Sequence, residues 1–429
     1  MSKPGHGVPI TEWLSDSPSE DDVEEIRQFL TEAGTFRFPT LSSGLFSAAA
    51  AENPEFRLTG YQYVWARDNI HVAHALWLTG EKEKAAAAVS SLLEFYSKHR
   101  QKFLDVLEDR ADAADPMQRP HIRFDGESLS EVDVRWAHAQ NDALAYVLWL
   151  ACKLLRSGDL QITPKSIDVF QLLVQYFEKI EYWQDEDSGH WEETRKIEAS
   201  SIGTVVAALS ELRTWLTDQP ESLIDPVQLN DLIEQGHRAL AAILPAECVQ
   251  ESPLQNRRYD AALLFLIFPL NVVDDSMAET IISDVREHLT SDIGIRRYLG
   301  DSYWCANYRD LLSADVRTTD FSDDTSSRDA LLKPGEEAQW CIFDPILSVI
   351  HGQRYLETGD AREFQLQLHH FRRSLAQLTT EESRFPAYRC PESYFLEHGR
   401  WIPNDITPLL WTQANLLMAI QVMKQSTAR

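Results

Sequence analysis

Two glutamates carry the strongest chemical signal in this 429-residue sequence. Glu192 stands between Trp191 and Glu193, where apolar packing and a neighbouring carboxylate would both raise its pKa, as a proton donor requires. Glu392 lies near the C-terminal end, in a Cys-Pro-Glu-Ser-Tyr segment. Hydrolysis of a glycosidic bond needs two carboxyl groups, one to protonate the leaving oxygen and one to activate water or attack the anomeric carbon. Glu192 is thus a candidate acid and Glu392 a candidate base, although a glutamate before a helix can also simply complement the helix dipole.

Tryptophan, arginine, acidic and amide side chains gather in further short clusters. Sugar rings stack their apolar faces on indole, and their hydroxyl edges pair with bidentate donors and acceptors. Half of the twelve tryptophans lie in or near these clusters, namely Trp65, Trp136, Trp191, Trp304, Trp340 and Trp401. The alternative is that tryptophans only cap the ends of a large core. The clustering favours a sugar-binding pocket.

Helical periodicity dominates the sequence, so helices must position these residues. Twelve helices are predicted, over 21–33, 67–79, 81–98, 138–156, 164–180, 199–216, 226–243, 256–267, 276–289, 335–357, 361–378 and 405–425. Gly80 is placed to end the second helix, and Asp405 to cap the last. Strand-like alternation is confined to short stretches such as 36–46 and 294–299, and 315–328 is predicted to be a long loop.

Short turns such as 78–82 and 357–361 join the predicted helices in pairs. Without a fixed-period repeat, six hairpins favour a closed all-α toroid, an (α/α)6 barrel, over a solenoid. We predict that residues 1–429 form one catalytic domain, with 1–36 as an N-terminal lead-in segment. Every cluster precedes or opens an even-numbered helix. Since alternate helices of a toroid run parallel, these helix ends share one face, and we expect one pocket there.

Composition narrows the classes of partner. Hydrophobic residues make up 44% and charged residues 25%, which is typical of a globular protein. The net charge of −27 argues against nucleic acid or an anionic membrane surface as partner. No apolar stretch is long enough to span a membrane, and the N-terminal residues lack the apolar region of a secretory signal. The five scattered cysteines favour a reducing compartment, so we expect a cytoplasmic protein.

Motifs of other chemistries are missing from the sequence. There is no HExxH, CxxC, GxSxG, GxGxxG or GxxxxGK[ST] pattern. We therefore expect no metal and no cofactor. A protein partner is left open.

At the clusters the sequence resembles glycoside hydrolase family 15, the glucoamylase family. The matching segments follow the family's order and span nearly the whole chain. They are Tyr63-x-Trp65-x-Arg67-Asp68, Trp136 with Gln140 and Asp142, Trp191-Glu192-Glu193, Arg297 with Asp301, and Pro391-Glu392-Ser393-Tyr394. The last segment is closer to the glucoamylase-like domain of phosphorylase kinase regulatory chains than to the usual glucoamylase pattern.

The resemblance implies an inverting, exo-acting α-glucosidase that releases glucose from the non-reducing ends of α-glucans, with Glu192 as acid and Glu392 as base. It implies that Arg67 and Asp68 clamp the terminal glucose, that Trp136 stacks near the cleavage point, and that Glu193 and Arg297 bind hydroxyls. The further substrate-binding candidates are Tyr63, Trp65, Gln140, Asp142, Trp191, Asp301, Trp340 and Tyr394. No segment resembles a bacterial β-sandwich or a starch-binding domain, so we expect soluble maltooligosaccharides as substrates.

Two other functions stay open at this point. The likeness to the kinase chains allows a non-catalytic, α-glucan-binding regulatory protein, which would bind sugar and a partner protein without hydrolysis. Another carbohydrate enzyme, such as a phosphorylase or an epimerase, is also compatible with a helical toroid. A phosphorylase would need an anion pocket in place of the base, and Glu392 argues against that.

Overall fold

The structure, a computed structural model, describes residues 9–50, 58–217 and 224–429. Among them six helices form an inner ring in which each contacts the next and the last contacts the first. In ring order these are α2 (Ala66–Leu78), α5 (Asn141–Arg156), α7 (Ala199–Leu216), the 3₁₀ helix η4 (Ala261–Leu266), α12 (Phe343–Thr358) and α14 (Leu410–Thr427). The described residues thus form the closed toroid that the sequence predicts.

Six further helices pack around the ring, and each contacts a member of it. They are α1 (Glu20–Glu32), α3 (Lys82–Lys98), α6 (Pro164–Lys179), α8 (Pro226–Ile243), α9 (Asp275–Asp284), which runs on as a π-turn over Val285–Leu289, and α13 (Ala361–Ala376). Inner helices such as α5 are buried on almost every side, whereas outer helices such as α13 bury one stripe, as expected of an outer layer. The predicted turns join α2 to α3 and α12 to α13, and Gly80 follows α2 with a φ of +98°, as a helix-ending glycine does.

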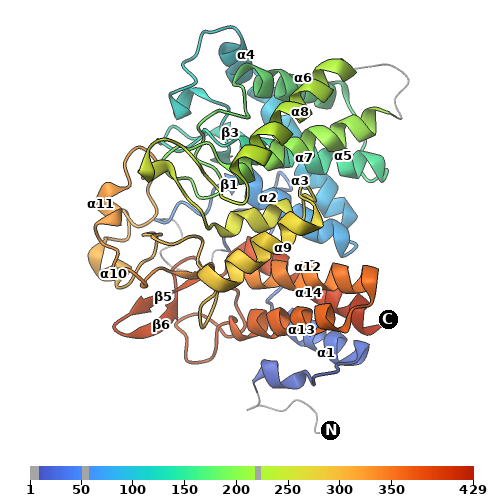
Figure 1. Cartoon of the computed structure of the whole chain (residues 1–429), viewed down its shortest axis with the longest axis vertical. Coiled ribbons are helices and arrows are strands. Elements are labelled where there is room, and N and C mark those ends of the chain that lie inside the picture. The colour runs from blue at the N-terminus through green and yellow to red at the C-terminus, as the bar shows by residue number, and fades with distance from the viewer. Residues whose placement is uncertain (1–8, 51–57, 218–223) are drawn as a thin grey trace.

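One side of the barrel carries the loops, the short helices and the strands (Figure 1). One antiparallel sheet joins β1 (Val64–Trp65), β2 (Arg123–Asp125) and β3 (Ser130–Glu131), and another joins β4 (Gln339–Trp340), β5 (Ser393–Glu397) and β6 (Arg400–Pro403). The short helices α4 (Gln101–Leu107), α10 (Tyr308–Leu311) and α11 (Ser326–Asp329) belong to the connecting segments. Register places Trp65 beside Arg123 and Trp340 beside Ser393, so these short strands fix residues that precede inner helices.

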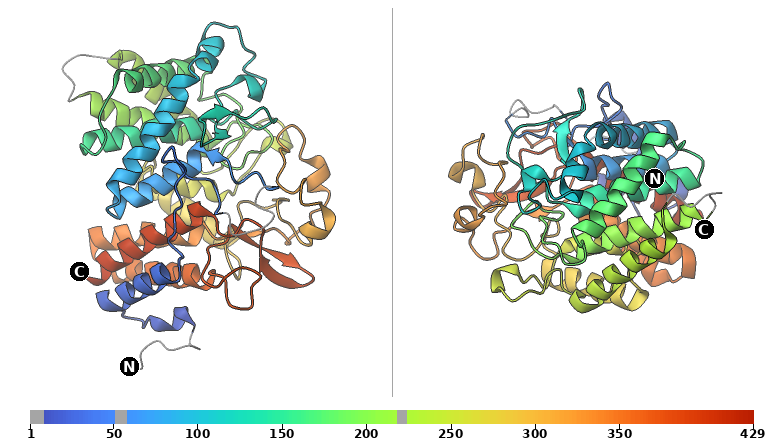
Figure 2. Two further views of the ribbon diagram at one scale, coloured as in Figure 1. Left: turned by 180° about the vertical axis from the view of Figure 1, so that it is seen from behind. Right: turned by 90° about the horizontal axis from the view of Figure 1, so that it is seen from above.

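The N-terminal part of the chain packs on its C-terminal part. The 3₁₀ helix η1 (Ile10–Trp13) contacts α13, and α1 contacts α14, which Figure 2 shows from behind. Ser19 and Asp22 form a reciprocal capping box that starts α1. The assignment of the chain to one domain, with 1–36 as a lead-in segment, stays a prediction, and residues 1–8 lie outside the described part.

Three predicted helices differ from the structure, and each difference has a proline nearby. The segment 256–267 forms only η4, which Asp260 caps and which ends shortly before Pro269. The segment 335–357 begins its helix at Phe343, with Pro345 in the first turn, because Gln339 and Trp340 pair as a strand. The segment 405–425 begins at Leu410, just after Pro408.

Two smaller expectations were also wrong. Asp405 is not the cap of α14, since it is buried in the loop before the helix and its carboxylate pairs with Arg317 and Arg384. The stretches 36–46 and 294–299 form isolated bridges rather than strands, among them Thr40 with Phe46 and Ile295 with Trp340. Alternation over so few residues does not distinguish a strand from a single bridge.

Candidate active site

A cavity opens at the N-terminal ends of the inner helices. Its empty volume is about 750 Å³, counting space open to solvent. Side chains from six separate parts of the chain line it: the loop before α2 with its first turn, the segments before α5 and α7, the region 297–328, the segment before α12, and the segment before α14 with its first turn. Glu192 and Glu392 both lie in its wall. The cavity therefore collects the predicted clusters on one face of the toroid.

Glu192 lies in a tight loop before α7. Asp187 and Lys196 exchange backbone hydrogen bonds of 2.9 and 2.8 Å, which close the loop, and the amide of Ser188 donates to the carbonyl of Ala139. Within this loop Glu192 has a φ of +59°, a left-handed conformation that non-glycine residues adopt only where their surroundings impose it. Burial raises the pKa of Glu192, which favours the protonated form that an acid catalyst needs.

Arg67 holds the Glu192 carboxylate from the first turn of α2. Its Nη2 donates to Glu192 Oε1 at 3.1 Å, while its Nη1 donates to Asp142 at 2.7 Å and to Gln140 at 3.0 Å. Asp142 is fully buried, so the guanidinium and this carboxylate form a desolvated ion pair. Arg67 therefore joins the starts of α2 and α5 to the loop of Glu192.

Glu392 immediately precedes β5, and two side chains fix its carboxylate. The hydroxyl of Tyr61 donates to Oε1 at 2.8 Å, and Nδ2 of Asn404 donates to Oε2 at 2.6 Å. Glu392 is 2% exposed, and burial raises its pKa to about 7, although both hydrogen bonds favour the ionised form. No arginine or lysine forms an ion pair with Glu392 among the described residues, and the effect of burial on its pKa outweighs the hydrogen bonds and the more distant charge of Arg297.

Indole side chains form much of the wall and leave donors unused. Trp136, Trp340 and Trp411 line the cavity, and the Nε1 atom of each is buried with no hydrogen-bond partner among the described residues. Asp68, also in the wall, is buried, and this burial raises its pKa to about 7. Buried polar groups are normally paired, so the three unpaired indole N–H groups are exceptions within this wall.

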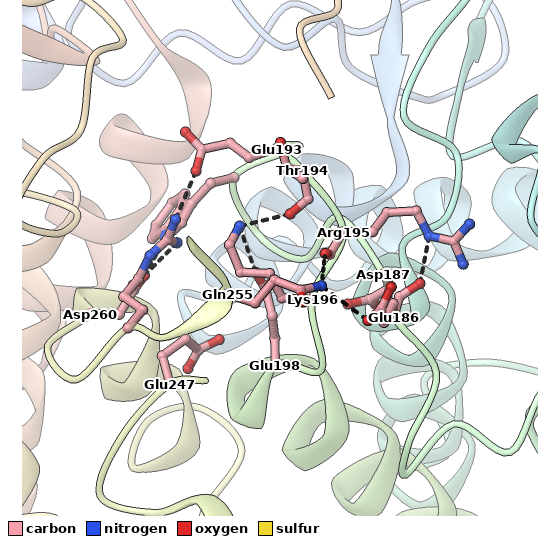
Figure 3. A network of polar contacts seen from close by, with 12 residues as sticks. Glu186, Asp187, Glu193, Thr194, Arg195, Lys196, Glu198, Glu247, Gln255 and Asp260 are labelled. Carbon is pink, nitrogen blue, oxygen red and sulfur yellow. Dashed lines mark hydrogen bonds and ion pairs between the residues drawn. The ribbon is translucent and has the colours of Figure 1, made fainter. Parts of the chain in front are cut away.

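Glu193 lies behind the cavity wall in a cluster of cations. Arg257, Arg297 and Arg328 all pair with its carboxylate, at 3.0, 3.3 and 2.8 Å, and Tyr298 donates to it at 2.6 Å. Figure 3 shows Glu193 above a buried group of further acids that includes Glu198, Glu247 and Asp260. The cluster locks the loop of Glu192 to α11 and to the segment before η4.

The structure brings nine of the predicted residues together in the cavity wall: Trp65, Arg67, Asp68, Trp136, Trp191, Glu192, Arg297, Trp340 and Glu392. Six others lie outside the lining. Gln140, Asp142, Glu193 and Asp301 are buried behind it as partners of arginines. Tyr63 stacks on Arg123, and Tyr394 on β5 donates to the carbonyl of Gln377.

Two tryptophans expected near the mouth are not in the lining. Trp304 is fully buried and packs on Tyr308 and Phe395, and Trp401 lies on β6. Trp304 is therefore a core tryptophan, which was the alternative to a place in the pocket.

Sequence reasoning missed ten lining residues: Tyr61, His190, Tyr303, Thr318, Thr319, Asp320, Phe321, Arg328, Leu409 and Trp411. Tyr61 could have been found, since it precedes Tyr63 and Trp65 at the two-residue spacing of one strand face. The residues 318–321 belong to the stretch predicted as a long loop, and nothing in their types signalled that the loop would reach the cavity.

Two classes of site find no support in the part of the chain that the structure describes. No group of three or more His, Cys, Asp or Glu side chains there could hold a metal ion. No helix there has the length and apolar character to cross a membrane.

A sequence model of Glycosyl hydrolases family 15 matches residues 32–386. The chain belongs to this family.

Relatives agree with this assignment. The chain is 29% identical over 285 residues to the probable phosphorylase b kinase regulatory subunit alpha of Caenorhabditis elegans, a match that covers 56% of the chain but only 21% of that protein. A glycosidase variant solved with glucose has a TM-score of 0.65 at 16% identity, covering 94% of this chain and 98% of its own. The glucoamylase of Saccharomycopsis fibuligera has a TM-score of 0.61 at 13% identity over 99% of both chains. At such identities the two structures establish the shared (α/α)6 toroid.

Proposed function

We propose that this protein is an inverting, exo-acting α-glucosidase that releases glucose from the non-reducing ends of soluble α-glucans. The observation that carries the proposal is that Glu192 and Glu392 line one cavity, each held by its own set of hydrogen bonds. Membership of the family supports hydrolysis of a glycosidic bond.

In this reaction Glu192 donates its proton to the glycosidic oxygen as the bond from that oxygen to the anomeric carbon breaks. Glu392 removes a proton from a water molecule, whose oxygen attacks the anomeric carbon from the opposite side. Burial raises the pKa of both proposed catalytic carboxyl groups, as it does that of Asp68 in the same wall, and of the two only Glu192 pairs with a cation, Arg67. Tyr61 and Asn404 orient the carboxylate of Glu392 toward the attacking water.

The remaining groups of the wall bind the sugar. The indoles of Trp136, Trp340 and Trp411 offer faces for the apolar side of a glucose ring and free N–H groups for its hydroxyls. Asp68 accepts hydrogen bonds from hydroxyls of the terminal glucose. Arg67 positions Glu192 rather than binding sugar, since its Nη atoms are already engaged by protein groups. We also propose an intracellular location, which the five unpaired, buried cysteines support.

The second candidate is a regulatory protein that binds α-glucan without hydrolysis, favoured by the likeness to a kinase regulatory subunit. One experiment separates the two. The purified chain is incubated with maltotriose and released glucose is measured, while calorimetry measures maltotriose binding to the Glu192→Gln variant. Release of glucose by the unchanged protein supports the α-glucosidase. Binding of maltotriose to the variant, with no release of glucose by the unchanged protein, supports the regulatory protein. Neither binding nor release would overturn both candidate functions.

A further inference from the structure

Arg123 is a buried cation with no direct ion-pair partner among the described residues, although the carboxylates of Glu192 and Asp320 lie near enough to favour its charged form. It lies on β2 and is 5% exposed. Its guanidinium carbon is 3.9 Å from the ring centre of Trp136 and 4.7 Å from that of Tyr63. These rings cover the faces of the planar guanidinium, whose N–H groups lie in its plane, at its rim. Among the described residues those groups make no hydrogen bond or ion pair, and Nε is fully buried.

A second cavity lies against this side chain. Its empty volume is about 850 Å³, and Arg123, Gly60 and Tyr63 line it. It adjoins the first cavity, because Trp136 and Asp320 lie in both walls, whereas Glu192 and Glu392 lie only in the first. The second cavity therefore lies next to the first, beyond the shared side chains of Trp136 and Asp320.

Local packing holds the guanidinium in place although it forms no direct ion pair among the described residues. A Cβ atom on residue 60 would lie 2.6 Å from Nη2 of Arg123, so glycine there lets the guanidinium lie against the loop. A buried charge without a partner costs several kcal/mol, unless a ligand supplies the partner. Burial lowers the pKa of Arg123, and the nearby carboxylate of Glu192 acts against this shift.

Asp320 supplies the complementary feature of the same wall. Its Oδ1 accepts the amide of Ser322 at 2.8 Å, while its Oδ2 is buried without a partner among the described residues. A ligand that fits both side chains carries an acceptor for Arg123 and a hydroxyl that donates to Asp320. A neutral hydroxyl would satisfy an N–H of Arg123 but would leave its charge, whereas a carboxylate or phosphate does both.

We propose that the second cavity binds a hydroxylated anion, a sugar acid or sugar phosphate, as the leaving group of the glycoside, and that Arg123 determines this specificity. The proposal rests on the proposed function, which places the glucose in the first cavity. The proposed substrate is negatively charged, and the protein's net charge of −27 would repel it. A preference for this anion must therefore come from a local cation, Arg123.

The test compares two ligands that differ in one group. Maltobionate and maltitol both carry an α-glucosyl unit on an open-chain polyol, but only maltobionate ends in a carboxylate. Calorimetry on the full chain with Glu392→Gln, which binds these glycosides without cleaving them and leaves the wall of the second cavity intact, should give a Kd for maltobionate about tenfold lower than for maltitol, the gain expected of one charge-assisted pair. Maltose 1-phosphate against maltose, measured in the same way, shows whether phosphate replaces carboxylate.

Variants assign the preference to Arg123. In Arg123→Gln the ratio of the two Kd values should fall to near one, and Arg123→Lys should keep part of it. Arg100→Gln, which removes an exposed arginine paired with Asp168, should leave the ratio unchanged. A ratio near one in the Glu392→Gln chain with Arg123 intact, for carboxylate and phosphate alike, would overturn the inference alone, as would a ratio that survives when Arg123→Gln is added to the same folded chain. Binding of none of these ligands would overturn the proposed function together with the inference.

Discussion

The hydroxyl of Tyr61 lies 2.8 Å from Oε1 of Glu392 and donates a hydrogen bond to it. This bond joins the loop before β1 to the segment before β5, so it ties the start of the barrel to its end. It also favours the ionised form of Glu392, against the burial that raises the pKa of this carboxyl group to about 7. The pKa of Glu392, and with it the fraction of the base that is ionised, therefore depends on the balance between burial and this hydrogen bond.

We predict that kcat/KM for maltotriose rises as the pH increases through about 7. Since the pKa of Glu392 is raised to about 7, the carboxylate that must accept a proton is lost below that pH. In Tyr61→Phe the pKa of Glu392 should rise further, and the acid limb should move to higher pH. A pH profile of kcat/KM checks this, and an acid limb unmoved in Tyr61→Phe would contradict it.

The roles of the two carboxyl groups can be separated with a substrate that needs no acid. Glu192→Gln and Glu392→Gln should each lower maltotriose hydrolysis by about 10²–10⁴-fold, the usual contribution of a general acid or base. On α-glucosyl fluoride, whose leaving group needs no proton, Glu192→Gln should regain much of the rate and Glu392→Gln should not.

A surface substitution controls for the loss of charge. Glu94→Gln, which removes an exposed carboxylate paired with Lys165, should match the unchanged protein on both substrates. Equal losses on the fluoride in both site variants would show that Glu192 is not the acid.

Arg67→Lys should damage both stability and catalysis. A lysine cannot bridge Asp142 and Glu192 as the planar guanidinium does, so one of these two carboxyl groups loses its partner. We expect a loss of about 3–5 kcal/mol in the free energy of unfolding, measured by urea denaturation. Arg67 lowers the pKa of Glu192, so its loss should also move the alkaline limb of the pH profile upward. An unchanged unfolding midpoint would contradict the positioning role.

Glu198, one of the buried acids in Figure 3, leads us to predict that the stability of the fold decreases as the pH rises. Burial raises the pKa of Glu198 to about 7 in the folded protein, whereas an unfolded glutamate titrates near about 4.3. The fold therefore favours the protonated form, and its contribution is present at low pH and is lost as the pH rises through about 7. Thermal unfolding between pH 5 and 8 should show a falling midpoint, with a smaller fall in Glu198→Gln. Equal slopes in the two proteins would contradict this origin.

The sequence predicts most of the ring and less of the site. Periodicity locates eleven of the twelve barrel helices, because each buries a stripe or a whole face over several turns. It fails at η4, whose six buried residues, Ala261–Leu266, show no periodicity that separates a 3₁₀ helix from an α-helix. The glutamates and tryptophans at the helix ends were found because their types are unusual. Thr318 and Asp320 were missed because their place in the wall depends on how a long loop folds back, as in the hydrogen bond of Thr318 to the carbonyl of Thr59.

The stereochemistry of the released glucose tests the central claim most directly, that Glu192 and Glu392 act as an acid and a base on opposite sides of one bond. Proton NMR can follow the anomeric signals during the first minutes of maltotriose hydrolysis, before mutarotation mixes them. We predict that β-glucose is released first. Initial release of α-glucose, or no glucose at all from a folded protein that binds maltotriose, would contradict the account.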